Sequence, residues 1–165
     1  MLPSVESSGQ WSKVGSYAIV NEHAMQEFGR TLVGKLPRGA LVSLSGELGA
    51  GKSVLARSMI HALGYQGRVK SPTYTLIETY EVEGASEAHR FQIAHMDLYR
   101  LADPEELDYL GFDDVSRPCD LIIIEWIEMG GERVPEPHVR IAIEYAENDS
   151  RRLTIESTLD LQLAI

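Results

Sequence analysis

Cysteine, basic residues and long apolar runs are scarce in this sequence, and each shortage excludes a class of protein. Cys119 is the only cysteine among 165 residues, so no internal disulfide can form, which suits a reducing compartment. No neighbouring residue would activate its thiol, and we expect it to be unreactive. No apolar run approaches the ~20 residues that span a bilayer, and residues 1–13 lack the pattern of a secretory signal. We therefore expect a cytoplasmic protein without a membrane segment.

Positive charge is also in short supply. Lysine and arginine number 15 against 25 aspartates and glutamates, which gives a formal net charge of -10. The longest positive cluster is Arg151-Arg152. Because nucleic-acid binding draws much of its affinity from basic side chains on phosphates, we expect no tight direct binding to RNA or DNA. Any link to nucleic acid should pass through a partner protein.

Glycine, in contrast, is concentrated in a phosphate-binding motif. Residues 46–53 read GELGAGKS and fill every position of the pattern G-x-x-x-x-G-K-S/T. An apolar stretch, residues 40–45, precedes them, and apolar residues at helical spacing follow from Leu55 to Leu63. A strand that leads through a glycine loop into a helix directs backbone N–H groups at an anion. A Gly-rich turn that arose by chance would rarely combine the full motif with a strand before it and a helix after it. The segment therefore predicts nucleoside triphosphate binding.

The loop residues have separate expected roles. Lys52 would neutralise the β- and γ-phosphates, and the Ser53 hydroxyl would bind a magnesium ion. The sequence has no Asn-Lys-x-Asp guanine signature, which favours ATP over GTP. The residues expected to contact the nucleotide from this segment are Glu47, Leu48, Gly49, Ala50, Gly51, Lys52, Ser53 and Val54.

The periodicity along the chain predicts one α/β domain of the P-loop NTPase fold, with a mixed, partly parallel sheet and antiparallel edge hairpins. We expect residues 1–17 to form a flexible N-terminal extension and residues 18–165 the ATPase domain. The remaining expected elements are a helix capped by Asn21 and ending near Leu36, a hairpin of residues 75–83 and 91–99, a helix starting with a capping box at residues 103–106, a buried strand at 121–126, and two C-terminal strands containing Val139–Tyr145 and Leu153–Ile155.

Glu125 is the candidate for a second magnesium ligand. It ends the apolar run 121–124, where P-loop proteins place an acidic residue, usually aspartate. The alternative is a glutamate that only ends a strand. An ionised group at the end of a buried strand needs a partner, which favours the metal-linked role. Trp126 follows directly. The sequence leaves two roles open for it, packing in or at the rim of the core, or contact with the nucleotide.

A second set of polar residues alternates along one strand. His95, Asp97 and Tyr99 project from one face, while Ala94 and the apolar residues that alternate with them project from the other. Periodicity alone favours a solvated polar face. Beside a phosphate loop, however, Asp97 could hold a magnesium-bound or attacking water.

Two further features stay undecided at this level. Ser71-Pro72-Thr73 follows the loop helix, either as a switch segment whose Thr73 hydroxyl reaches the phosphate or metal, or as a plain turn. No arginine stands out as a catalytic finger. The candidates are Arg100, Arg133, Arg151 and Arg152.

Together these segments resemble the bacterial TsaE (YjeE) family. The resemblance rests on GELGAGKS, the segment from Ser71 to Thr75, His95-Met96-Asp97-Leu98-Tyr99-Arg100-Leu101, and Glu125-Trp126, in this order. It extends from about residue 18 to the C-terminal strands. The phosphate loop is widespread, whereas the other segments at this spacing are far more specific.

The resemblance implies a small ATPase needed to make threonylcarbamoyladenosine (t6A) on tRNA. Such proteins work with TsaD and TsaB, while TsaC makes the threonylcarbamoyl-adenylate separately. It further implies that Ser53 and Glu125 hold magnesium, that Asp97 acts in hydrolysis together with Lys52, and that Trp126 lies near the nucleotide. The family usually has threonine where Ser53 stands, and both carry the required hydroxyl.

Two other functions fit the same motif. A small-molecule kinase would need a second substrate pocket and arginines to clamp the transferred group, and clustered arginines are scarce here. A non-enzymatic switch would dock a partner in its ATP-bound form, with hydrolysis incidental. A slow ATPase and such a switch use the same residues.

Overall fold

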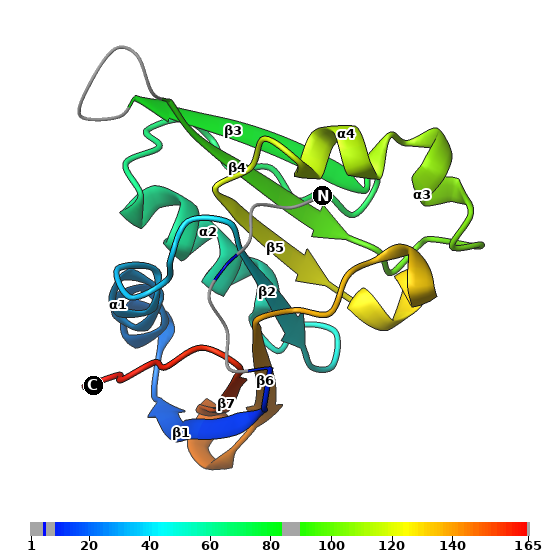
Figure 1. The fold of residues 1–165 in the computed structure, drawn as a ribbon. Coiled ribbons are helices and arrows are strands. Elements are labelled where there is room, and N and C mark those ends of the chain that lie inside the picture. The colour runs from blue at the N-terminus through cyan, green and yellow to red at the C-terminus, as the bar shows by residue number, and fades with distance from the viewer. Residues whose placement is uncertain (1–4, 6–8, 84–89, 165) are drawn as a thin grey trace.

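The structure is a computed structural model that describes residues 5, 9–83 and 90–164. Within these residues seven strands form one sheet in the order β1-β7-β6-β2-β5-β4-β3 (Figure 1). The strands are β1 Ser12–Ile19, β2 Ala40–Ser45, β3 Ile77–Glu83, β4 Arg90–Asp97, β5 Leu121–Glu125, β6 Val139–Tyr145 and β7 Arg151–Ser157. The helices are α1 Glu22–Val33, α2 Lys52–Ala62, α3 Glu106–Tyr109 and α4 Phe112–Ser116, with 3-10 segments η1 Ile127–Arg133 and η2 Glu147–Asp149.

The centre of the sheet is parallel and its edges are antiparallel. Strand β2 runs parallel to both β5 and β6, and β5 runs parallel to β4. Strands β7 and β1 continue one side in antiparallel pairing, and β3 closes the other. The predicted mixed sheet with central strands β2 and β5 and antiparallel edges is confirmed. The predicted connection of the β3–β4 hairpin, residues 84–89, lies outside the described residues.

Both faces of the central strands are buried, which explains their continuous apolar sequences. Val42 and Ile123 pack into the cluster that includes the buried sides of α1 and α2. Their neighbours Leu41 and Ile122 point the opposite way, into a cluster with residues of α3 and α4. Since successive side chains of a strand alternate between faces, a sheet covered by helices on both sides favours apolar residues at nearly every position, and Ser43 is the buried polar residue within β2 (Figure 1).

Side-chain capping occurs at the start of α1 and in the turn before α3, which itself begins at Glu106, later than the predicted capping box implies. Asn21 Oδ1 accepts a hydrogen bond of 2.8 Å from the Ala24 backbone N–H, as predicted for an N-cap. Helix α1 ends at Val33, three residues before the predicted end at Leu36. At the predicted capping box, Asp103 Oδ1 accepts from Glu105 N–H, and Glu106 Oε1 accepts from Asp103 N–H.

The predicted boundary between a flexible extension of residues 1–17 and the domain does not coincide with the start of the first strand. It falls after residue 17, inside strand β1, whose residues 12–19 pair with β7. Tyr17 also packs its ring against Phe28 of α1, with centroids 5.5 Å apart. Serine and glycine are uncommon in strands, so the residue types of this segment did not indicate one. Backbone pairing with β7 at the edge of the sheet nevertheless stabilises the strand.

The structure also bears on the single cysteine and on the lack of long apolar runs in the sequence. Cys119 is buried, and burial raises the pKa of its thiol to about 11, as expected of an unreactive cysteine. Among the residues that the structure describes, no helix has the length and apolar character needed to cross a membrane.

Candidate functional site

The phosphate loop joins β2 to α2 as predicted. Strand β2 ends at Ser45 and α2 begins at Lys52, with Gly46, Gly49 and Gly51 at positive φ in between. Gly46 has a second requirement, because a Cβ there would lie 2.4 Å from the carbonyl oxygen of Ile143 in β6. The loop therefore passes over β6 at a distance that only glycine permits.

Lys52, the first residue of α2, extends its side chain back to the start of this loop. Its side chain is buried, with 5% of the residue exposed, and Nζ donates to the carbonyl oxygens of Gly46 (2.6 Å) and Glu47 (2.9 Å). Burial lowers the pKa of Lys52, and the nearby carboxylates Glu125 and Asp97 offset part of this effect. A bound anion would favour the charged ammonium group in the same way. The loop thus presents a partly desolvated cation where a phosphate would lie.

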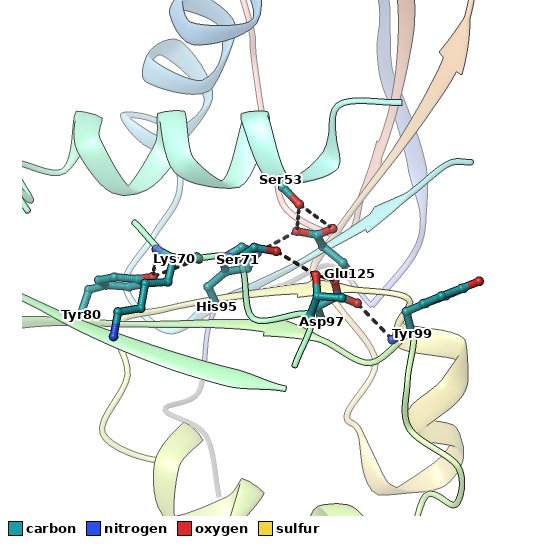
Figure 2. Close-up of polar contacts among 9 residues, drawn as sticks. Ser53, Lys70, Ser71, Tyr80, His95, Asp97, Tyr99 and Glu125 are labelled. Carbon is teal, nitrogen blue, oxygen red and sulfur yellow. Dashed lines mark hydrogen bonds and ion pairs between the residues drawn. The ribbon is translucent and has the colours of Figure 1, made fainter. Parts of the chain in front are cut away.

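Ser53 and Glu125 face each other across the cleft (Figure 2). Ser53 Oγ lies 3.1 Å from Glu125 Oε1 and 3.3 Å from Oε2, and Glu125 is 2% exposed. A hydroxyl and a carboxylate that converge in this way are the oxygen ligands that Mg²⁺ prefers, and Mg²⁺ commonly takes few protein ligands. The two residues therefore fit a magnesium site at the end of β5.

Strand β4 brings two more polar side chains to the same edge. Asp97 pairs with Glu125 in parallel register, so both stand at the carboxyl ends of adjacent strands. Asp97 Oδ1 accepts from the Tyr99 N–H at 3.0 Å, and Oδ2 accepts from Thr73 Oγ at 3.2 Å. His95 Nε2 lies 2.8 Å from Glu125 Oε1.

The expectation of a solvated polar face on β4 is therefore wrong. His95 and Asp97 are 1% and 5% exposed, because the start of α2 and the turn at residues 72–75 cover this face (Figure 2). Tyr99 lies beyond the strand end and is 42% exposed. The opposite face, with Ala94, is core as predicted.

The segment around Thr73 forms a turn that also touches the site. Leu76 N–H donates to the Pro72 carbonyl at 2.7 Å, and the Ser71 and Thr73 hydroxyls lie 2.8 Å apart. The Thr73 bond to Asp97 ties this turn to the end of β4. The turn and the contact with the site are thus both present.

Trp126 forms one wall of the cleft. It adopts positive φ directly after β5, which turns the chain and places its ring 4.7 Å from Lys52 Nζ and 5.0 Å from the Tyr99 ring. The cavity between these groups has a volume of about 220 Å³. Its lining includes Leu48, Gly49, Gly51, Lys52, Ser53, Val54, Thr73, Asp97, Tyr99, Glu125 and Trp126.

Arg151 is the site residue that sequence reasoning did not distinguish from other arginines. Its Nε donates to the Ala50 carbonyl at 3.0 Å, and its guanidinium stacks on the Tyr145 ring at 4.2 Å. The Tyr145 hydroxyl in turn donates to the Leu48 carbonyl. The β6–β7 hairpin therefore supports the phosphate loop from outside. No local sequence pattern indicates that Arg151 contacts the loop, because the contact depends on where the β6–β7 hairpin lies in the sheet.

On this side of the loop lies a second hollow, of about 210 Å³. It is separate from the cleft at Glu125, and the two share loop residues such as Gly49 and Gly51. Its other lining residues are Ile19, Asn21, Glu22, Met25, Ala50, Val54, Asp149 and Arg151.

Replacing Arg151 by alanine should weaken binding of an ATP analogue by about tenfold, because the loop loses an external hydrogen bond worth ~1 kcal/mol or more. Isothermal titration calorimetry measures the effect. Arg152→Ala is the matched control, since Arg152 is exposed and should change affinity less than about twofold. Equal affinities of the two variants would contradict a loop-supporting role for Arg151.

The fold and the loop define a single-domain P-loop protein with a Walker A motif and an acidic residue at the end of the adjacent strand. A sequence model described as "Threonylcarbamoyl adenosine biosynthesis protein TsaE" matches residues 19–153. The chain belongs to the TsaE family.

Individual proteins agree with this assignment. The tRNA threonylcarbamoyladenosine biosynthesis protein TsaE of Haemophilus influenzae is 39% identical over 148 residues, which cover 87% of this chain and 89% of the relative. The protein of the same name from Streptomyces coelicolor is 38% identical over 130 residues, covering 76% and 82%. The crystal structure of Bacillus subtilis YdiB superposes with a TM-score of 0.73 at 23% identity, over 92% of this chain and 89% of that one, and supports the fold.

Proposed function

We propose that this protein is a magnesium-dependent ATPase that serves the t6A modification of tRNA together with TsaD and TsaB, with TsaC acting separately in the same pathway. Membership of the TsaE family supports the pathway. The observation that carries the ATPase is the convergence of Lys52, Ser53, Asp97 and Glu125 on one cavity beside the phosphate loop.

The residues of the cavity divide the work. The backbone from Glu47 to Val54 would bind the phosphates, and Thr73 and Trp126, which also line the cleft, would contact the nucleotide. Lys52 would neutralise the β- and γ-phosphates. Ser53 and Glu125 would hold Mg²⁺, which balances phosphate charge when bound. The nucleoside would then extend toward the hollow beside Arg151.

Asp97 would act in hydrolysis by accepting a hydrogen bond from the attacking water. Its carboxylate lines the cavity on the same strand edge as Glu125, and Thr73 holds one of its oxygens. Both oxygens already have donors, so the carboxylate is fixed in place. A fixed acceptor orients a water better than a mobile one.

The acidic balance of the chain favours action through partners rather than by direct tRNA binding. The formal net charge is -10, and the longest basic cluster includes Arg151, which is engaged at the loop. We place the protein in the cytoplasm, where tRNA and a reduced Cys119 would both be found.

The kinase and the switch remain as alternatives with different signatures. A kinase would need arginines to clamp the transferred group, and the residues that the structure describes as lining the cavity include none. A switch would bind TsaD and TsaB in a nucleotide-dependent way and support modification without hydrolysis.

The deciding experiment measures ATP hydrolysis by the purified chain, alone and with TsaD and TsaB. Stimulation by the partners is expected. A hydrolysis rate that is the same with and without TsaD and TsaB would contradict the proposed partnership in t6A modification. Transfer of phosphate to a small acceptor faster than to water would instead establish a kinase.

In the same assay Asp97→Asn should lower turnover about a hundredfold, within the range that a catalytic acid or base contributes, while nucleotide affinity changes little. Asp114→Asn, at an exposed carboxylate on α4, is the matched control and should keep full activity. Full turnover in Asp97→Asn would remove Asp97 from the hydrolytic machinery.

A further inference from the structure

His95 is a buried polar residue with an incompletely satisfied imidazole. It is 1% exposed, and its Nε2 lies 2.8 Å from Glu125 Oε1. Its other ring nitrogen, Nδ1, has no hydrogen-bond partner among the described residues. A buried nitrogen without a partner costs free energy, so an apolar residue would suit this part of the core better. The bond to Glu125 is therefore the contact that explains why a histidine occupies this buried position.

Glu125 is the residue that needs such a contact. A glutamate has one more rotatable bond than the aspartate usual at this position, so its carboxylate requires additional fixing. Oε1 is near two donors, His95 Nε2 and Ser53 Oγ, whereas Oε2 has only the longer Ser53 contact of 3.3 Å. His95 comes from the neighbouring strand β4 and reaches the carboxylate from beneath the cleft (Figure 2).

We propose that His95 is a positioning residue, which holds Glu125 Oε1 so that the carboxylate stays turned toward Ser53 and Oε2 is left for the magnesium ion. The inference rests on the proposed function, because the orientation matters only if Glu125 serves the ion. A ring N–H bonded to a metal-binding carboxylate fixes its orientation as outer-shell partners do elsewhere, and loss of such a partner typically weakens metal binding 10- to 100-fold.

Two amide substitutions separate this role from simple packing. The amide nitrogen of His95→Gln can occupy the place of Nε2 and donate to Glu125. His95→Asn has the same chemistry but is one methylene too short to reach it. The measured quantity is the ratio of affinities for a non-hydrolysable ATP analogue with Mg²⁺ and with EDTA, obtained by calorimetry on the full chain.

We expect His95→Asn to lower the Mg²⁺-dependent gain in affinity about tenfold and His95→Gln to restore it to within about threefold of wild type. Affinity in EDTA should stay within about twofold for both, whereas general damage would lower it as well. An unchanged gain in His95→Asn, or equal losses in both variants, would overturn the positioning role. Wild-type protein without any Mg²⁺-dependent gain would overturn the proposed magnesium site itself.

A spectroscopic measurement covers the case in which His95→Asn does not fold. In ¹⁵N-labelled wild type, the Nε2–H resonance of His95 is identified by its absence in His95→Gln. Adding Mg²⁺ to the nucleotide complex should shift it, because the bonded carboxylate then also contacts the ion. A resonance that ignores Mg²⁺ would contradict the proposal.

Discussion

Replacing Lys52 by alanine is expected to abolish measurable ATP hydrolysis and to weaken nucleotide binding by at least about tenfold. Lys52 is the one lysine in the lining of the cleft that the structure describes, and its Nζ already stands at the loop carbonyls of Gly46 and Glu47. Removing it leaves the carboxylates Asp97 and Glu125 without their nearby cation, so an incoming triphosphate meets net repulsion. Steady-state phosphate release and calorimetric titration measure the two effects.

The control is the same substitution at Lys35, which is exposed beyond the end of α1. Lys35→Ala should hydrolyse ATP at the wild-type rate. The melting temperature of Lys52→Ala, followed by circular dichroism, should remain close to that of wild type. Turnover above about a tenth of wild type in folded Lys52→Ala would contradict its role at the phosphates.

The second large effect is expected from Glu125→Gln, which should lower turnover at least about a hundredfold at saturating ATP. Glutamine keeps the volume of the side chain and one oxygen toward Ser53, but a neutral amide is a poor magnesium ligand. Glu125 is 2% exposed, so this near-isosteric change avoids the cavity that alanine would create. Turnover is measured over a range of Mg²⁺ concentrations, and excess Mg²⁺ should recover part of the rate.

Glu128→Gln provides the comparison, because Glu128 also acts electrostatically on Lys52 but is exposed in η1. Its rate should stay within about twofold of wild type. If Glu125→Gln behaves in the same way, Glu125 only ends a strand and the metal ligand must be sought elsewhere.

Local sequence patterns were sufficient to predict the centre of the fold. The apolar runs of β2 and β5 are continuous because helices cover both sheet faces, and that burial is visible in the residue types alone. Strand β1 escaped prediction for the opposite reason. It lies at an edge, most of its residues are partly or fully exposed, and backbone pairing with β7 requires no particular side chains.

The site divides in the same way. The phosphate loop and Glu125 are recognisable because each depends on a short segment with a fixed relation to its own strand. Arg151 was not, since its contact with Ala50 requires β6 and β7 to pair so that Tyr145 lies opposite Arg151. The burial of His95 likewise depends on α2, whose position over β4 is a property of the whole sheet.

The parallel pairing at the centre of the sheet has a consequence for synthesis on the ribosome. Strand β2 pairs with β5 and β6, both of which are translated about eighty or more residues after it. Until then its apolar residues, such as Leu41 and Val42, have no strand on either side. Contacts so distant in sequence close slowly. The cleft beside the phosphate loop can therefore assemble only late in translation, and a ribosome stalled before β5 would carry the phosphate-loop motif on a nascent chain that lacks Glu125 and Trp126.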